Sequence, residues 1–145
     1  MSGTLLVVAG AAFSAGRLLL TRRPDDGPHA GLWELPGGKV EPGETPEEAL
    51  GREWKEELGV DLVVADLEPW AFASGAPHGR HVTLLVFRVP SMRGEPAPIG
   101  VAEVRWARPD EALSLPLLPA DRPLVERLVR REGCLCLPAP EEAGG

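Results

Sequence analysis

The chain has 145 residues, 43% of them hydrophobic and 26% charged, which predicts one globular domain with a core of its own. Its net charge of −7 argues against a protein that coats nucleic acid polymers or an anionic membrane. No apolar run is long enough to span a membrane, and the start lacks the basic leader of a signal peptide. We therefore expect a small-molecule partner, with no nucleic acid polymer and no membrane.

Two cysteines, Cys134 and Cys136, lie one residue apart near the end of the sequence. A disulfide between them would be strained, and two thiols are too few for a closed zinc site. The simplest interpretation is a reduced, cytoplasmic protein. We place a single domain over residues 1–133 and a flexible tail over residues 134–145.

The N-terminal third is predicted to be extended. Residues 4–13 are apolar and partly β-branched, and the turn at 14–16 joins them to residues 17–21 as a hairpin. Residues 22–31 are rich in Pro, Gly and charge, so we expect a loop. A short extended piece at 33–35 then precedes the break at Pro36-Gly37-Gly38.

A helix is predicted to begin after Thr45 and to end at Gly59. Thr45 can cap it, Pro46 suits the first helical position, and Glu48 completes a capping box. At 100° per residue the helix has three faces. The acidic face spans about 100° and contains Glu53, Glu56 and Glu57. The adjacent core face contains Leu50, Trp54 and Leu58, whereas Glu48, Arg52 and Lys55 point elsewhere.

The second half mixes strands and helices. We expect strands at 62–74, 81–89 and 103–107, a helical turn at 110–113 and an amphipathic helix at 124–131. His78 and His81 lie in the loop between the first two strands, and neither is given a role. This order of elements predicts an α/β sandwich around a mixed sheet.

The acidic face points to a cation. A solvated surface is the alternative, but the carboxylates repel each other by roughly 0.2–0.5 kcal/mol per pair. The glycines of Pro36-Gly37-Gly38 let backbone groups approach a ligand, which makes Gly38 a candidate substrate contact. Oxygen ligands without a nearby histidine pair indicate Mg²⁺ or Mn²⁺ rather than zinc. Since Mg²⁺ commonly bridges to phosphates, phosphoanhydride hydrolysis is the expected reaction.

Residues 38–60 follow the spacing G-x5-E-x7-R-E-U-x-E-E-x-G-U, where U is bulky and apolar. This pattern resembles the signature of the Nudix hydrolases at every fixed position. The resemblance implies a Nudix-fold α/β/α sandwich with a mixed β-sheet, and Mg²⁺ as cofactor with Mn²⁺ as a substitute. It implies as principal metal ligands Glu53, Glu56 and Glu57, helped by the carbonyl of Gly37. Arg52 would orient these carboxylates, Glu44 would support the loop, and one glutamate would deprotonate the attacking water.

The flanks resemble one group within that family. Residues 21–23, 31–39 and 41–46 are similar to MutT-type nucleoside triphosphate diphosphatases, and 110–124 to their CTP pyrophosphohydrolase branch. The implied reaction converts (deoxy)nucleoside triphosphates, of cytidine or of oxidised bases such as 8-oxo-dGTP, to monophosphate and pyrophosphate. A nucleoside diphosphate-sugar or ADP-ribose hydrolase is an alternative, and an inactive nucleotide-binding module is another. The oligomeric state is left open.

Substrate contacts follow from the same resemblance. Asp121 would read the base edge or cap the last helix, and Arg23 would contact phosphate or sugar or be solvated. Arg80 would lie near the nucleotide. Trp33 and Leu35 would wall the base or pack in the core.

One position departs from the group. MutT-type enzymes usually place a further glutamate about six residues before the tryptophan that matches Trp106, and this chain has Gly100 there. The nearest acidic residues are Glu95 and Glu103, and Glu103 is expected to face the core edge of its strand. The identity of the general base is therefore left open.

Overall fold

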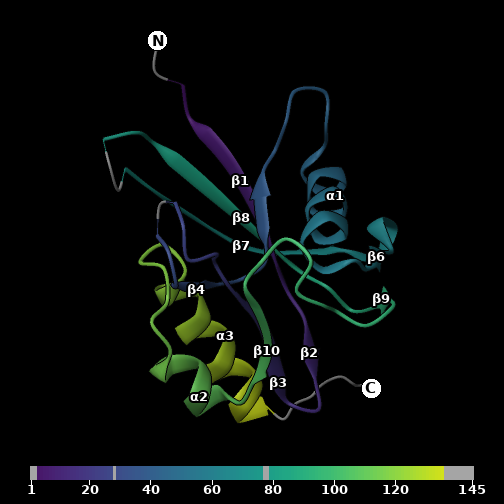
Figure 1. The fold of residues 1–145 in the computed structure, drawn as a ribbon, viewed down its shortest axis with the longest axis vertical. Helices are drawn as coiled ribbons and strands as arrows, with labels where there is room; N and C mark the ends of the chain where they lie inside the picture. The colour runs from purple at the N-terminus through teal and green to yellow at the C-terminus, as the bar shows by residue number, and fades with distance from the viewer. Residues whose placement is uncertain (1–2, 28, 77–78, 136–145) are drawn as a thin grey trace.

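The computed structural model describes residues 3–27, 29–76 and 79–135, with side chains described as far as Arg130 (Figure 1). His78, Cys136 and the remainder of the expected tail lie outside these residues. The last helix includes the backbone of Cys134 and Leu135, beyond the domain boundary expected at residue 133. The flexible tail therefore stays a prediction.

Strands dominate the chain, and one long helix divides them. The first half contains β1 (Leu5–Ala11), β2 (Phe13–Ser14), β3 (Arg17–Arg22), β4 (Trp33–Glu34), β5 (Gly37–Lys39) and α1 (Pro46–Leu58). The second half contains β6 (Asp61–Leu62), the 3₁₀ turn η1 (Val64–Asp66), β7 (Glu68–Gly75), β8 (Val82–Arg88), β9 (Met92–Arg93), β10 (Glu103–Ala107), α2 (Pro109–Ser114) and α3 (Arg122–Leu135).

The strands form two four-stranded sheets and one small pair. The first sheet has the order β5-β1-β8-β7, in which β1 and β8 are parallel and the other pairs antiparallel. The second has the order β10-β3-β2, with β4 also paired to β3, and β6 pairs with β9. Helix α1 lies on one side of the strands, and α2 and α3 lie on the other (Figure 1). The predicted α/β sandwich with a mixed sheet is confirmed.

Two apolar clusters fill the space on either side of the strands. On β3, Leu19 packs in the α1 cluster, while Leu18 and Leu20 pack in the cluster that α3 completes. Likewise Val8 of β1 faces the α1 cluster and Ala9 faces the α3 cluster. This alternation follows from the two-residue period of a strand, and it explains why β1 and the centre of β3, Leu18 to Leu20, are apolar on both faces.

Two strand predictions are wrong in detail. The hairpin turn is present, but only Phe13–Ser14 pairs with β3, whereas Leu5–Ala11 lies between β5 and β8 in the other sheet. A strand that is apolar on both faces is stable in a sheet centre, and β1 takes that place. The strand expected at 62–74 is interrupted by η1, so that β6 and β7 belong to different sheets.

Among the residues that are described, no helix is long and apolar enough to cross a membrane.

Candidate active site

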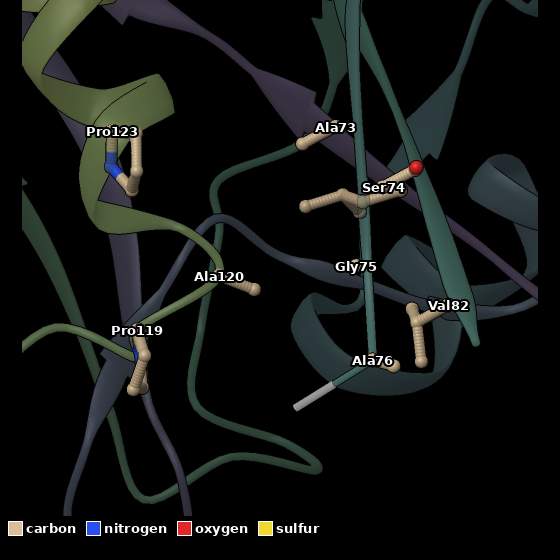
Figure 2. Close-up of a pocket in the computed structure, with 9 residues that line it drawn as sticks. Ala73, Ser74, Gly75, Ala76, Val82, Pro119, Ala120 and Pro123 are labelled. Atoms are coloured by element: carbon tan, nitrogen blue, oxygen red, sulfur yellow. The ribbon is translucent and has the colours of Figure 1, made fainter. Parts of the chain in front are cut away.

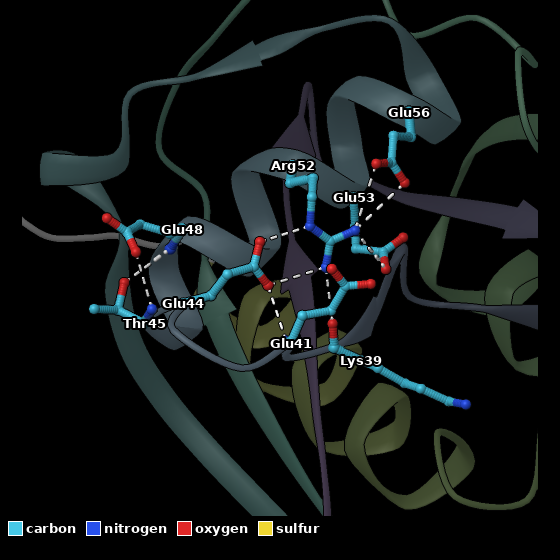
Figure 3. A network of polar contacts seen from close by, with 8 residues as sticks. All are labelled: Lys39, Glu41, Glu44, Thr45, Glu48, Arg52, Glu53 and Glu56. Carbon is cyan, nitrogen blue, oxygen red and sulfur yellow. Dashed lines mark hydrogen bonds and ion pairs between the residues drawn. The ribbon is translucent and has the colours of Figure 1, made fainter.

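Both ends of α1 are fixed by hydrogen bonds. The Thr45 hydroxyl accepts a bond of 3.1 Å from the Glu48 amide, and the Glu48 carboxylate accepts one of 3.0 Å from the Thr45 amide (Figure 3). Gly59 ends the helix with a left-handed φ of 74°, and its amide donates to the Lys55 carbonyl. The predicted capping box and terminal glycine are confirmed, and they hold the first and the last turn of α1 respectively.

The core face of α1 is anchored to the glycine loop. Leu50, Trp54 and Leu58 are fully buried, as predicted. The Trp54 indole N–H donates a 2.8 Å hydrogen bond to the Pro36 carbonyl. A Cβ on Gly10 of β1 would come within 2.7 Å of the Trp54 ring, so only glycine admits the ring there. The helix is therefore locked against both β1 and the loop that precedes β5.

The two glycines of the loop allow close approach in opposite directions. A Cβ on Gly37 would collide with the carbonyl of Val8, across the β1–β5 pair. A Cβ on Gly38 would collide with the carboxylate of Glu53. Backbone and carboxylate thus meet here without an intervening side chain, which fits the expected approach of this loop to a ligand.

Arg52 binds several parts of the site together (Figure 3). Its guanidinium donates to both Glu44 oxygens, at 2.6 and 3.1 Å, and to the Lys39 carbonyl at 3.0 Å. It also contacts the carboxylates of Glu53 at 3.2 Å and Glu56 at 3.4 Å. The bonds from Arg52 hold the pKa of Glu44 below its usual value. Although Arg52 lies off the acidic face, its long side chain reaches back and ties that face to the loop.

Glu53 and Glu57 form a tight carboxyl pair on the acidic face. Their carboxyl groups lie close enough for each to affect the pKa of the other. Burial raises the pKa of Glu57 far above its usual value, and the negative charges of Glu53 and Glu34 raise it further. Burial also raises the pKa of Glu53, although Arg52 opposes that effect. Two carboxyls this close in a half-buried place are stabilised when they share a proton or meet a cation.

The donor set fits a hard divalent cation. It consists of carboxylate oxygens beside the backbone of Gly37 and Gly38 at the start of β5, and no imidazole or thiolate belongs to it. Within the described residues, no three acidic, histidine or cysteine side chains are already gathered as a ligand group. Glu56 explains this, because its side chain is 59% exposed and turned towards Arg52. Glu53 and Glu57 are thus brought together, while Glu56 lies next to them on the surface.

Glu34 is a site residue that the sequence analysis missed. It is in β4, its side chain is only 17% exposed, and Arg23 donates to its two oxygens at 3.0 and 3.3 Å. Burial raises its pKa, which the nearby Arg23 counteracts. The sequence did contain a signal for Glu34, because it stands between the apolar residues Trp33 and Leu35 in a short strand. Those two pack in the α3 cluster, so strand alternation turns Glu34 towards α1.

Thr21 and Arg23, which lie at the end of β3 and just after it, each have a buried polar atom without a hydrogen-bond partner among the described residues. The Nε of Arg23 and the hydroxyl of Thr21 are buried and make no hydrogen bond to the described residues. Thr21 pairs in register with Glu34, so these atoms lie beside the acidic group. Buried polar groups normally have partners, so a water or a ligand atom is expected here.

Asp121 lies where α3 begins, but its carboxylate bonds elsewhere. It accepts a 2.9 Å hydrogen bond from the amide of Leu35, while its backbone carbonyl accepts from the amide of Val125. Asp121 is 95% buried, and burial raises its pKa to about 7. Trp33 and Leu35 are both core residues, which is the packing alternative. Leu35 therefore reaches Asp121 through its backbone.

An open pocket of about 410 Å³ lies next to this segment (Figure 2). One wall is the paired ends of β7 and β8, and the other is the segment that leads into α3. Its lining is small or apolar, namely Ala73, Ser74, Gly75, Ala76, Val82, Leu84, Pro119, Ala120 and Pro123. Asp121 lies in the chain between the lining residues Ala120 and Pro123, but it is not itself a lining residue.

Arg80 and Glu103 were both expected near the edge of the site or of the core, and the structure places both at the surface. Arg80 is exposed in the loop before β8, and no hydrogen bond within the described residues ties it to the carboxylates. Glu103 does not face the core: it is 39% exposed and forms ion pairs with Arg105 at 2.9 Å and Arg22 at 3.2 Å. These arginines lower the pKa of Glu103, whose carboxylate is therefore engaged in ion pairs on the surface of the second sheet.

The comparison with known proteins agrees with this geometry. The NUDIX domain family matches residues 4–128. The chain is 41% identical over 120 residues to the CTP pyrophosphohydrolase of Escherichia coli K12, covering 83% of this chain and 87% of that protein. It is 38% identical over 131 residues to a Mycobacterium tuberculosis H37Rv protein provisionally named 8-oxo-dGTP diphosphatase 2, covering 86% and 88% respectively.

Solved structures show the same fold. The solution structure of the E. coli ORF135 protein superposes with a TM-score of 0.79 at 36% identity, covering 92% of this chain and 94% of that one. The crystal structure of the MutT NUDIX hydrolase from Burkholderia pseudomallei gives 0.77 at 31% identity, covering 88% and 99%. The neighbours thus match nearly the whole domain as well as the acidic helix.

Proposed function

This chain belongs to the Nudix hydrolase family, as its signature predicted, and we propose that it splits nucleoside triphosphates into nucleoside monophosphate and pyrophosphate. The observation that carries the proposal is the half-buried Glu53–Glu57 pair, in which Glu53 is held by Arg52 and lies against Gly38. The names of the two relatives support a triphosphate as substrate.

The residues that would hold Mg²⁺, or Mn²⁺ in its place, are Glu53, Glu56, Glu57 and the carbonyl of Gly37. When bound, the cation supplies positive charge that offsets the phosphates and makes water a better nucleophile. Since Glu56 is turned towards Arg52, a small rotation of its side chain would complete the group. Arg52 would then keep the carboxylates in position, with Glu44 fixing Arg52 in turn.

The reaction itself needs one proton acceptor. A water molecule adds to phosphorus, the bond between the α and β phosphates breaks, and pyrophosphate leaves. A carboxylate of the acidic face takes the proton of the water, and a cation bound beside it would keep that carboxylate ionised and able to accept. Glu53, Glu56 and Glu57 are the candidates for this role.

We propose that the base enters the pocket between β8 and the segment before α3. A protonated Asp121 can donate one hydrogen bond and accept another, so it can pair with a base edge that carries both groups, as cytosine and oxidised purines do. With a pKa of about 7 both protonation states are accessible near neutral pH. Arg23, with its unpartnered Nε, would contact a phosphate or the sugar, and Gly38 and Arg80 remain candidate substrate contacts.

A nucleotide panel with Mg²⁺ and with Mn²⁺, analysed by product, tests the proposal. We expect pyrophosphate and monophosphate, with CTP, its deoxy form or 8-oxo-dGTP as the preferred substrate. Release of orthophosphate, or faster cleavage of ADP-ribose than of every triphosphate, would overturn it. Absence of turnover with every compound would favour an inactive nucleotide-binding module.

Asp121→Asn in the same panel tests the base pocket. The amide still accepts from Leu35 but cannot change its charge, so the preference between cytosine and oxidised guanine should shift by roughly 10-fold or more in kcat/KM. Equal losses with all bases would show that Asp121 acts on the fold rather than on the base.

A further inference from the structure

Gly100, the position at which the sequence departs from the MutT-type pattern, packs against the backbone of α1. The amides of Ile99 and Gly100 both donate to the carbonyl of Glu57, each at 3.0 Å. The amide of Ala97 donates to the carbonyl of Leu58, also at 3.0 Å. The segment that follows β9 therefore caps the end of the helix that carries the acidic face.

This contact replaces bonds that a helix cannot make for itself. The last four carbonyls of an α-helix have no partner within it, and a final turn without partners tends to fray. In α1 the amide of Gly59 satisfies one of them, and the segment from Ala97 to Gly100 satisfies those of Glu57 and Leu58. The turn that positions the Glu57 carboxyl is thus held from outside.

The close approach depends on the absence of a side chain at position 100. A Cβ there would lie 3.0 Å from the carbonyl oxygen of Glu56 and 3.3 Å from the Cα of Glu57. Gly100 does not have a positive φ, so the tight contact and not the backbone conformation favours glycine here. To accept alanine at this position, the segment or the backbone of α1 would have to move by a few tenths of an ångström.

We propose that Gly100 is a positioning residue, which clamps the last turn of α1 and thereby fixes the Glu57 carboxyl for metal binding. This inference rests on the proposed function of the site. Its consequence is that position 100 cannot regain a catalytic carboxylate by a single substitution. Gly100→Glu would separate the segment from α1 before its side chain could act, so the variant loses activity instead of gaining it.

The test compares Gly100→Ala and Gly100→Glu with two controls in the full-length protein. Gly51→Ala adds a methyl group to α1 near Val64, away from the clamp, and Ile99→Ala shortens a side chain that is 66% exposed while keeping the amide donor. Three quantities are measured: hydrogen exchange of the amides at 99 and 100, affinity for Mn²⁺ by calorimetry, and kcat and KM for a nucleoside triphosphate.

Both position-100 variants should exchange these amides faster, bind Mn²⁺ about 10-fold more weakly and lose kcat to a similar extent, with little change in nucleotide KM. The controls should resemble the wild type. Unchanged exchange and Mn²⁺ affinity in Gly100→Ala, or higher kcat in Gly100→Glu, would overturn the inference. If the wild type itself neither binds Mn²⁺ nor hydrolyses triphosphates, the proposed function fails, while the exchange data still decide whether the clamp exists.

Discussion

The acidic face of α1 and the pocket beside α3 are built in different ways. Around the acidic face, Arg52 alone makes directed contacts to Glu44, Glu53, Glu56 and a loop carbonyl, and glycines let backbone and carboxylate meet. The pocket has small, mostly apolar walls, and the carboxylate of Asp121, in the segment that forms one wall, accepts its hydrogen bond from a backbone amide. The first arrangement fixes the positions of charges, whereas the second leaves room for different bases.

This difference predicts that substitutions at the two places will fail differently. Changes on the acidic face should abolish turnover with every nucleotide and leave nucleotide binding largely intact. Changes at the pocket should alter which nucleotide is preferred while the chemistry continues. Substitutions in the two regions can test this separation between turnover and nucleotide preference, and the largest effect is expected on the acidic face.

Glu53→Gln and Glu57→Gln should each lower kcat by about 10²–10⁴-fold, because each removes a candidate ligand or proton acceptor. Neither should lower the melting temperature, since the half-buried pair of like groups becomes an amide beside a carboxylate, which removes the repulsion between two charges. Product formation and thermal unfolding check both statements. Glu47→Gln, in the first turn of the same helix, is the control and should retain activity. Turnover at the wild-type rate in both glutamine variants would remove the acidic face from the mechanism.

Asp121→Asn should change how stability depends on pH. Folding raises the pKa of Asp121 from about 3.8 to about 7, so between these values the folded chain binds more protons than the unfolded chain. The free energy of unfolding contributed by this group therefore falls as pH rises from 4 to 7, by on the order of a few kcal/mol, and is constant above that range.

The Asp121→Asn variant does not lose free energy of unfolding in this way, because the amide does not titrate. Its amide oxygen still accepts from the Leu35 amide. The difference in melting temperature between variant and wild type should therefore grow in favour of the variant from pH 4 to 7, then level off. Other titrating groups are common to both proteins and cancel. A difference that does not vary with pH would show that the Asp121 carboxyl is not protonated by its burial.

The acidic face could be predicted from sequence because its information is local. Thr45, Pro46, Glu48 and Gly59 specify where the helix begins and ends, and a period of 3.6 residues then places the glutamates together. The extended reach of Arg52 was less evident, since a helical wheel shows where a side chain starts and not where its end lies. Its ion pairs depend on Glu44, eight residues earlier in the chain.

The pocket and the sheet order depend on contacts between distant segments. No local pattern indicates that Leu35 donates to Asp121, because 86 residues separate them. The hairpin prediction failed for a similar reason, since the choice of partners for β1 is made by β5 and β8 and not by the nearby turn. Glu34 lies between these cases: alternation with Trp33 and Leu35 gives its direction, but only the fold shows that α1 faces it.

Arg52→Ala and Arg52→Lys offer the smallest expected effect and the finest test of the division. Lysine keeps the charge but cannot donate to both Glu44 oxygens and to Glu53 at once, because it lacks the planar fork. Alanine should lower kcat by about 10- to 100-fold, as is typical of a residue that orients metal ligands, and lysine should recover part of it. The ratio of kcat/KM between cytidine and oxidised guanosine triphosphates should stay constant in both variants. If that ratio changes with Arg52, the helix also takes part in choosing the base, and the two regions cannot be treated as independent.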